Sequence, residues 1–152
     1  MLIYIGADHR GYNLKEKIKQ FLSKKGYTVV DEGNDHYDES DDYPDFASRV
    51  AVAVVEDPDN RRGILICGSG IGTNIVANKI QGIRAAKVDN SDQAFLSRKD
   101  TDCNVLSLGA DFLEEEEAKK ILSVWLMTPF SGEERHKRRI RKIGEIEIMR
   151  CK

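Results

Sequence analysis

A cysteine followed by a glycine-rich turn is the part of this chain best equipped for chemistry. The apolar run 64–66 ends in Cys67, and the next five residues, 68–72, have glycine at alternate positions. A cysteine at the carboxyl end of a buried strand lies where open α/β sheets bind ligands. Alternating glycines let consecutive backbone N–H groups converge on an anion at a helix N-terminus. A thiolate beside such amides can move a proton next to a carbonyl group.

Both features also have a structural interpretation. A lone cysteine at the end of a buried strand is often a small core residue, and glycines there often form a tight turn. The context of Cys67 favours chemistry, because a helix N-terminus and converging amides stabilise negative charge on sulfur. The glycine spacing is G-x-G-x-G rather than the G-x-G-x-x-G of dinucleotide-binding folds, so the sequence does not predict an NAD site.

A second polar group follows the first expected strand. Asp8, His9, Arg10 and Gly11 come directly after it. If the first and third strands are neighbours, this group lies at the same sheet edge as Cys67, which favours a shared site. The alternative is a helix-capping aspartate beside a solvated histidine.

Cations gather near the end of the chain. Six of them lie between Arg135 and Lys142, and Arg135 and Arg139 have the i, i+4 spacing that suits binding of one phosphate. The alternative is a solvated helix face. A nucleic-acid patch is disfavoured, because no aromatic residues interleave with the cations.

An acidic segment between residues 35 and 45 contains five aspartates and His36. Its spacing matches no known loop for a divalent cation. The sequence therefore predicts a solvated acidic loop and no metal site.

Apolar runs typical of strands alternate with one-faced helical patterns along the chain. Strands are expected at Leu2–Ala7, Tyr27–Val30, Gly63–Cys67, Ile83–Val88 and Asn104–Leu108, and helices at about 14–25, 44–54, 71–80, 91–99, 114–125 and 132–150. This order predicts a Rossmann-like three-layer α/β/α sandwich with a five-stranded parallel sheet, in one domain spanning 1–152. The basic C-terminal helix is extra to the sandwich, and we expect it to reach a neighbouring subunit.

Composition excludes several classes of function. The 24 basic and 26 acidic side chains give no overall attraction to nucleic acid or membrane. No apolar stretch approaches the roughly 18 residues of a spanning helix, and the first residues resemble a strand rather than a signal peptide. The three cysteines form no C-x-x-C pair. They favour reduced thiols and a cytoplasmic location.

The chain resembles the type B ribose-5-phosphate isomerases and the related galactose-6-phosphate isomerases. The matching motifs occur in family order: G-A-D-H-R-G (6–11), D-Y-P-D-F-A (42–47), G-I-L-I-C-G-S-G-I-G (63–72), A-N-K-I-x-G-I-R-A (77–85), L-S-R (96–98), N-V-L-S-L-G (104–109) and R-H-x-x-R (135–139). The resemblance implies a homodimer, often paired into tetramers, with active sites at the subunit interface. It also implies isomerisation of an aldose phosphate and a ketose phosphate without metal or cofactor.

The resemblance assigns a role to each matching residue. Cys67 takes the proton from the carbon next to the carbonyl, and Ser69 relays protons between the two oxygens. The enediolate is held by the loop amides of Gly68, Gly70, Ile71 and Gly72, the sugar by Asp8 and Tyr43, and the phosphate by His9, Arg135 and Arg139, with the arginines crossing from the partner subunit.

Two positions depart from the family pattern. Asp100 and Thr101 stand where the family has a ring-opening histidine and an asparagine. We expect Asp100 to take over ring opening as a weaker catalyst and Thr101 to bind the substrate. The alternatives are that His9 opens the ring, that the enzyme uses the small open-chain fraction of its substrate, or that Asp100 is only a polar residue at a helix end. Asp111 stands where the family often has a phosphate-binding arginine, and its carboxylate is expected to repel a phosphate. The sequence therefore predicts a metal-free sugar-phosphate isomerase, most simply of ribose 5-phosphate. The alternatives are an isomerase of another sugar phosphate, such as a hexose 6-phosphate, or a subunit of a hetero-complex.

Overall fold

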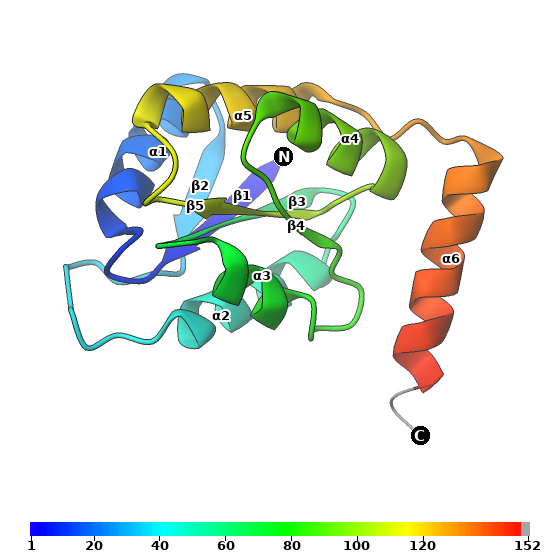
Figure 1. Ribbon diagram of the computed structural model, residues 1–152, viewed down its shortest axis with the longest axis horizontal. Helices are drawn as coiled ribbons and strands as arrows, with labels where there is room; N and C mark the ends of the chain where they lie inside the picture. Colours follow the sequence, from blue (N-terminus) through cyan, green and yellow to red (C-terminus); the bar gives the residue numbers. More distant parts are fainter. Residues whose placement is uncertain (150–152) are drawn as a thin grey trace.

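Five parallel strands form one sheet in the computed structural model, which describes residues 1–149 (Figure 1). They are β1 (Leu2–Ala7), β2 (Thr28–Asp31), β3 (Arg61–Cys67), β4 (Ala85–Lys87) and β5 (Val105–Gly109), in the spatial order β2-β1-β3-β5-β4. The helices are α1 (Tyr12–Lys24), α2 (Tyr43–Val55), α3 (Ile71–Ala77), α4 (Ser91–Thr101), α5 (Glu115–Met127) and α6 (Glu134–Met149). The predicted Rossmann-like α/β/α sandwich is confirmed.

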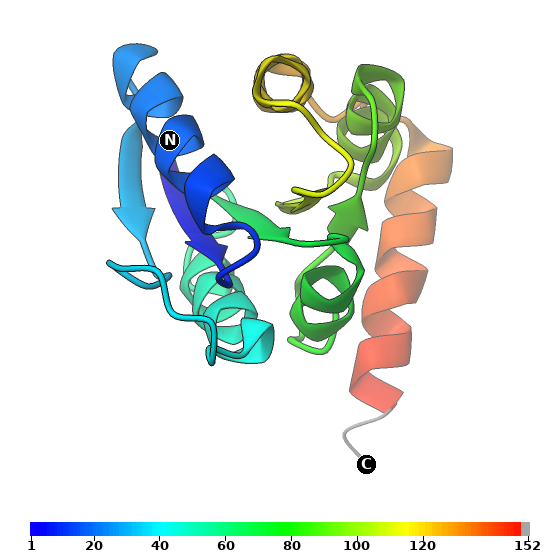
Figure 2. The ribbon, with the colours of Figure 1, turned by 60° about the vertical axis from the view of Figure 1, so that its left-hand side comes forward.

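Helices cover both faces of the sheet. Helices α1, α4 and α5 pack on one face, and α2 and α3 pack on the other (Figures 1 and 2). Leu14, Ile18 and Leu22 of α1 recur at helical spacing and are buried against the sheet. All five residues of β5 are buried, as in parallel strands covered on both faces.

The strand register places three strand ends side by side. Ala7 pairs with Ile66, and Cys67 pairs with Gly109, so β1, β3 and β5 end at one edge of the sheet. The condition for a shared site, that the first and third strands are neighbours, is therefore met. The loops after these three strands must meet above that edge, where open α/β sheets bind ligands.

Helix α3 and strand β4 are shorter than the sequence pattern predicts. The helix ends at Ala77 rather than near residue 80, because the Asn78 side chain donates to the Asn74 carbonyl and exchanges two hydrogen bonds with the backbone of Ala85. These bonds turn the chain into β4. Strand β4 then pairs with β5 over only three residues, Ala85–Lys87.

The extra C-terminal helix is present and runs beside the sandwich as α6 (Figures 1 and 2). It contacts α4, and its Glu147 accepts a hydrogen bond of 3.1 Å from the Gly82 backbone N–H. Its predicted last residue, Arg150, and Cys151 lie outside the described residues. Within residues 1–149, no helix combines the length and apolar character that a bilayer span requires.

Candidate active site

The loop after β1 is pressed against the end of β3. A methyl group at Gly11 would lie 2.4 Å from the Ile66 carbonyl oxygen, so only glycine allows this approach. Ala7 of β1 pairs with Ile66 of β3, so the next residue of each chain segment, Asp8 and Cys67, lies at the same end of the sheet. The two sequence motifs therefore meet at one edge of the sheet.

Cys67 is a buried thiol held by the backbone of the glycine loop. Its side chain is 4% exposed, and its Sγ accepts a hydrogen bond of 3.1 Å from the Gly70 N–H. Gly70 has φ +74°, and a methyl group there would lie 2.9 Å from the Leu108 carbonyl carbon. Glycine is therefore required at this position to aim the amide at the sulfur, and that amide stabilises negative charge on Sγ.

The sequence pattern did not predict two hydroxyl groups that lie next to Cys67. Thr73 Oγ1 lies 3.4 Å from Cys67 Sγ and 2.7 Å from Ser107 Oγ. Ser107 Oγ donates to the Gly70 carbonyl at 2.7 Å, so these buried hydroxyls hold the glycine loop on β5. A serine within the apolar run of β5 was the only local signal for this contact.

Ser69 and Tyr43 border the same loop. The Ile71 N–H donates to Ser69 Oγ at 3.2 Å, which holds the half-buried hydroxyl over the start of α3. Tyr43, the first residue of α2, is 38% exposed, and its ring lies against Gly72, where a methyl group would meet Tyr43 Cζ at 2.6 Å. The structure thus brings both predicted side chains to the Cys67 loop.

Asp8 is buried beside this loop. Its side chain accepts a hydrogen bond of 3.0 Å from the Gly11 N–H, and the residue is 6% exposed. Burial raises the pKa of the Asp8 carboxyl, against the opposing effect of the Gly11 bond. A carboxyl with a raised pKa takes up a proton more readily than an exposed aspartate does.

His9 is held by Asp41 from the acidic loop. Asp41 Oδ1 accepts from the His9 backbone N–H at 2.9 Å and lies 2.8 Å from His9 Nδ1. The Asp41 side chain is only 5% exposed, so the expected solvated acidic loop is wrong for this residue. No local pattern distinguishes Asp41 from its neighbouring aspartates, since the contact spans 32 residues of sequence.

Arg10 and Asp111 form an ion pair that bridges the loops after β1 and β5. The pair lies over Gly68, where a methyl group would meet Arg10 Nε at 2.6 Å and Asp111 Oδ2 at 2.8 Å. The Asp111 carboxylate is therefore neutralised by a guanidinium rather than left free. The expected repulsion of a phosphate by Asp111 must therefore be corrected, because Arg10 balances the charge of this carboxylate. The sequence pattern did not reveal Arg10 as its partner.

Asp100 and Thr101 lie far from Cys67 within the chain. The register aligns Val105 with Gly63 and Gly109 with Cys67, so the chain that enters β5 is at the opposite edge of the sheet. Four residues of parallel strand span about 13 Å. Since α4 ends at Thr101, just before β5, neither residue reaches the thiol of the same chain.

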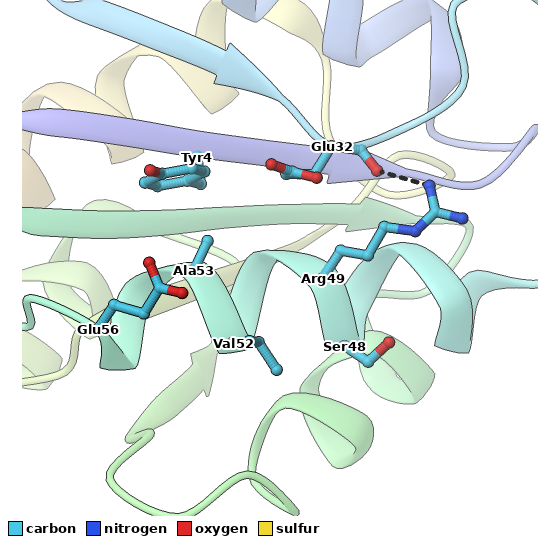
Figure 3. Close-up of a pocket in the computed structure, with 7 residues that line it drawn as sticks. All are labelled: Tyr4, Glu32, Ser48, Arg49, Val52, Ala53 and Glu56. Atoms are coloured by element: carbon cyan, nitrogen blue, oxygen red, sulfur yellow. Dashed lines mark hydrogen bonds between the residues drawn. The ribbon is translucent and has the colours of Figure 1, made fainter.

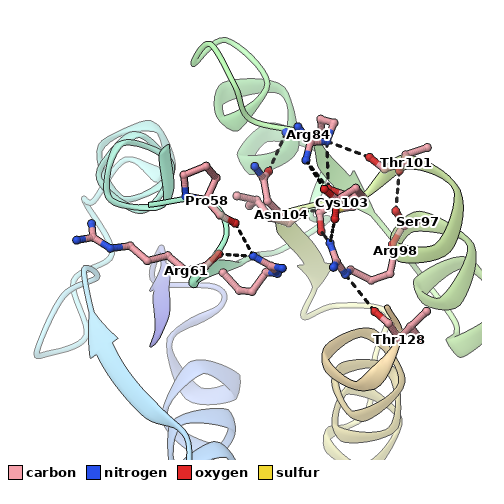
Figure 4. Close-up of polar contacts among 12 residues, drawn as sticks. Pro58, Arg61, Arg84, Ser97, Arg98, Thr101, Cys103, Asn104 and Thr128 are labelled. Atoms are coloured by element: carbon pink, nitrogen blue, oxygen red, sulfur yellow. Dashed lines mark hydrogen bonds and ion pairs between the residues drawn. The ribbon is translucent and has the colours of Figure 1, made fainter. Parts of the chain in front are cut away.

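The hydroxyl of Thr101 is also engaged at that opposite edge (Figure 4). It donates to the Ser97 carbonyl at 2.6 Å, while the Thr101 carbonyl accepts from Arg84 Nε at 2.9 Å. Arg84 and Arg98 further bind Asp102, which has φ +47° and ends α4. These arginines stabilise the turn into β5.

Arg135 and Arg139 lie on α6, whose first turn is at the same distant edge of the sheet. Between them His136 is 2% exposed, with Nδ1 2.8 Å from Ser131 Oγ and 3.7 Å from Asp100 Oδ1. His136 therefore anchors the first turn of α6 beside α4, while both arginines are exposed. The predicted site residues thus fall into two groups, one around Cys67 and one at the opposite edge of the sheet.

A separate pocket lies between β1, the end of β2 and α2 (Figure 3). Its polar lining includes Glu32, Arg49 and Glu56, and Arg49 Nη1 donates to the Glu32 carbonyl at 3.5 Å. The predicted site residues, all within residues 1–149, do not line it. The Cys67 edge therefore remains the candidate active site.

Comparisons with known proteins agree on one family. Residues 3–143 match the family model described as Ribose/Galactose Isomerase. The structure of ribose-5-phosphate isomerase B from Clostridium thermocellum has a TM-score of 0.93 and 50% identity, covering 98% of this chain and 99% of that one. The Mycoplasma genitalium enzyme with bound ribulose-5-phosphate has a TM-score of 0.93 and 43% identity, covering 96% and 95%. A D-erythrulose-4-phosphate isomerase from Pectobacterium atrosepticum is 44% identical, covering 86% of this chain and 85% of that protein.

Proposed function

Since the chain belongs to the ribose/galactose isomerase family and is an aldose–ketose isomerase, we propose that it interconverts ribose 5-phosphate and ribulose 5-phosphate with Cys67 as the base. The observation that carries the proposal is the buried Cys67 Sγ, bound by the Gly70 amide at the edge where Asp8 emerges. Residues of the protein are proposed for every step of this reaction, and we propose no metal or cofactor for it.

The proposed reaction moves one proton between neighbouring carbons. The Cys67 thiolate removes the proton from C2 of the open-chain aldose. The C2–H electron pair forms the C1–C2 double bond of an enediolate, and the π pair of the C1 carbonyl moves onto O1. Amides of the loop 68–72 stabilise the oxygen that gains charge; removing one such donor typically costs about 10²–10³ in rate. Ser69 Oγ transfers the hydroxyl proton from O2 to O1. The proton on Cys67 then returns to C1, which yields the ketose.

Both ends of the substrate have partners at the Cys67 edge. We assign Asp8 and Tyr43 to the sugar hydroxyls and His9 to the phosphate. Asp8 and His9 directly follow β1 where it pairs with the end of β3, and the Tyr43 ring lies against Gly72. Arg135 and Arg139 complete the phosphate site from a second copy of the chain, because their own copy places them at the opposite edge. Asp100 and Thr101 reach the sugar in the same way.

We therefore propose a homodimer, or a tetramer made of two such dimers, with shared active sites. A twofold axis exchanges the two edges of the subunits and completes two identical sites at once. Exposed apolar side chains on α3, which follows the Cys67 loop, and on α6 at the opposite edge support an interface. They are Ile71 and Ile75 on α3 and Ile146, Ile148 and Met149 on α6, each more than half exposed. We also propose a cytoplasmic location, because the mechanism needs a reduced thiol and thiols stay reduced there.

A coupled assay on the purified protein tests the substrate. We expect turnover to be fastest with ribose 5-phosphate and ribulose 5-phosphate, and slower with tetrose and hexose phosphates, when all are compared by kcat/KM under the same conditions. Activity confined to a hexose 6-phosphate or a tetrose phosphate would reassign the substrate within the family. Activity that appears only after a second, related chain is added would support the hetero-complex.

The acidic residue at position 100 favours a different substrate as the second candidate. A ring-opening catalyst takes a proton from the anomeric hydroxyl and returns one to the ring oxygen, which histidine does near neutral pH. Asp100 is a weaker acid–base group for this task. A relative that shares 44% identity with this chain carries the name of a tetrose-phosphate isomerase. In a tetrose 4-phosphate the oxygen that would close a furanose ring carries the phosphate, so such a substrate needs no ring-opening step.

The Asp100→His variant separates these two candidates. We expect it to improve turnover of ribose 5-phosphate, which must open its ring, and to leave turnover of ribulose 5-phosphate almost unchanged, since this ketose cannot close to a furanose. Measuring kcat/KM in both directions for the wild type and the variant checks this. An equal effect on both substrates, or none on either, removes the ring-opening role of position 100 and favours another substrate.

A further inference from the structure

We propose that Asp41 is a positioning residue that holds His9 as a phosphate-binding imidazolium. The inference deepens the proposed function, since it rests on a phosphorylated substrate. Asp41 Oδ1 lies within 2.9 Å of the His9 backbone nitrogen and 2.8 Å of Nδ1, so one oxygen fixes both the main chain and the ring. The ring is 27% exposed and its carboxylate partner 5%, so the histidine is accessible to a ligand while the carboxylate lies buried behind it.

The position of Asp41 is set from the core of the molecule. Its second oxygen, Oδ2, accepts from Asn34 Nδ2 at 3.0 Å. The Asn34 carbonyl accepts from Lys15 Nζ at 2.5 Å, and Lys15 is fully buried and also bound to Asp31 at 2.8 Å. Asp41 is therefore the outer end of a polar chain that begins on α1, and its carboxylate is not free to turn away from His9.

The hydrogen-bond geometry decides what His9 offers to a ligand. With Nδ1–H donating to Asp41, Nε2 carries a proton only when the ring is an imidazolium. A neutral ring would present a lone pair at Nε2, which a phosphate oxygen avoids. The carboxylate thus converts His9 into a donor for an anion, provided that the ring stays protonated.

The charged neighbours of His9 favour protonation. The hydrogen bond that His9 donates to Asp41 is the main cause that raises the pKa of His9, and the charge of Asp8 acts in the same direction. Burial and the charge of Arg10 oppose it. In the acidic loop, the charge of Asp38 also interacts with that of His9, and this interaction is one of the causes that lower the pKa of Asp38. The Tyr37 ring stands edge-on to it, 6.3 Å away between centroids.

The sign of the pH dependence follows from this direction. A histidine whose pKa is raised is protonated at low pH and loses its proton as the pH rises through that raised pKa. A phosphate monoester becomes a dianion above about pH 6. The contact between a charged ring and a phosphate dianion therefore exists between about pH 6 and the raised pKa of His9, and below about pH 6 the charged ring still meets a phosphate monoanion. Neutralising Asp41 lowers the pH at which the ring loses its proton.

The Asp41→Asn variant tests the inference, because asparagine still accepts from Nδ1–H but carries no charge. The pKa of each histidine is measured by NMR titration of the ligand-free protein, with His9 assigned through a His9→Gln variant. We expect the pKa of His9 to fall in Asp41→Asn. We also expect the affinity for inorganic phosphate to weaken about three- to tenfold near pH 7.5, and much less near pH 5.5, where the ring is protonated in both proteins.

Asp35→Asn is the matched control. It removes the same charge from the same loop, but Asp35 contacts His36, 2.6 Å away, rather than His9. Since Asp35 raises the pKa of His36, this variant should lower the pKa of His36 and leave His9, phosphate affinity and turnover unchanged. It also verifies that the titration detects the loss of a carboxylate partner.

A double variant separates a charge effect from a disturbed loop. In a His9→Gln background, Asp41→Asn should weaken phosphate binding no further. An unchanged pKa of His9 in Asp41→Asn overturns the inference, and so does an equal loss of phosphate affinity with and without His9. Failure of the pentose-phosphate assay is a separate outcome, because the titration and the phosphate measurement use neither sugar nor turnover.

Discussion

Cys67→Ser is expected to reduce kcat/KM by about 10²–10⁴, the contribution of a positioned general base, while the fold is kept. Serine is nearly isosteric with cysteine, and its hydroxyl can still accept from the Gly70 N–H that now binds Sγ. A hydroxyl, however, is a far weaker base than a thiolate. Steady-state kinetics in both directions, together with the melting temperature and phosphate affinity, check the expectation.

The matched control is Cys103→Ser. Cys103 is also buried, and its Sγ donates to the Val105 carbonyl at the opposite edge of the sheet. Burial raises the pKa of its thiol, so it is unsuited to act as a thiolate. This variant should keep wild-type turnover. Retention of more than about a tenth of activity by Cys67→Ser would make Cys67 structural and require another base. Substrate should also protect Cys67 from alkylation.

Mixed dimers of two inactive variants are expected to regain activity. In one variant Cys67 is replaced by serine, and in the other Arg135 and Arg139 are both replaced by alanine. If each site takes Cys67 from one chain and the arginines from the other, a mixed dimer contains one fully wild-type site. Mixed dimers isolated by both tags should then have roughly half of wild-type activity, since one of their two sites is intact, and an unfractionated random mixture roughly a quarter, because about half of its dimers are mixed.

The readout is turnover after co-expression with two different affinity tags, beside each parent variant alone. Both arginines are exposed, and His136 between them anchors α6, so their removal should leave the helix in place. Lys137→Ala, an exposed position on the same turn, serves as the control. No recovery in purified mixed dimers, or full activity in a monomer by sedimentation, would contradict shared sites.

Local patterns were sufficient to predict the architecture and the centre of the candidate site. The periodicity of Leu14, Ile18 and Leu22 specifies a one-faced helix, and the apolar run before Cys67 specifies a buried strand. Alternating elements allow only parallel strands with right-handed crossovers. The prediction was less accurate where a side chain ended an element, as Asn78 does for α3.

The contacts that complete the candidate site depended on residues far apart in sequence. Asp41 resembled a solvated aspartate until the loop folded back onto His9, and Asp111 resembled a repulsive charge until Arg10 was found beside it. These pairs are 32 and 101 residues apart. The partner of a surface charge depends on where whole loops come to lie, and no local spacing encodes this.

The sequence by itself determined the order of the elements, the thiol at the end of β3 and the family, because each is encoded in residue types a few positions apart. Only the tertiary structure decided that β5 lies between β3 and β4 and that the Thr73 and Ser107 hydroxyls support the thiol. It also decided that Asp100 starts from the opposite edge of the sheet. Parallel pairing aligns strand ends through hydrogen bonds between distant segments, and that alignment sets which side chains can meet.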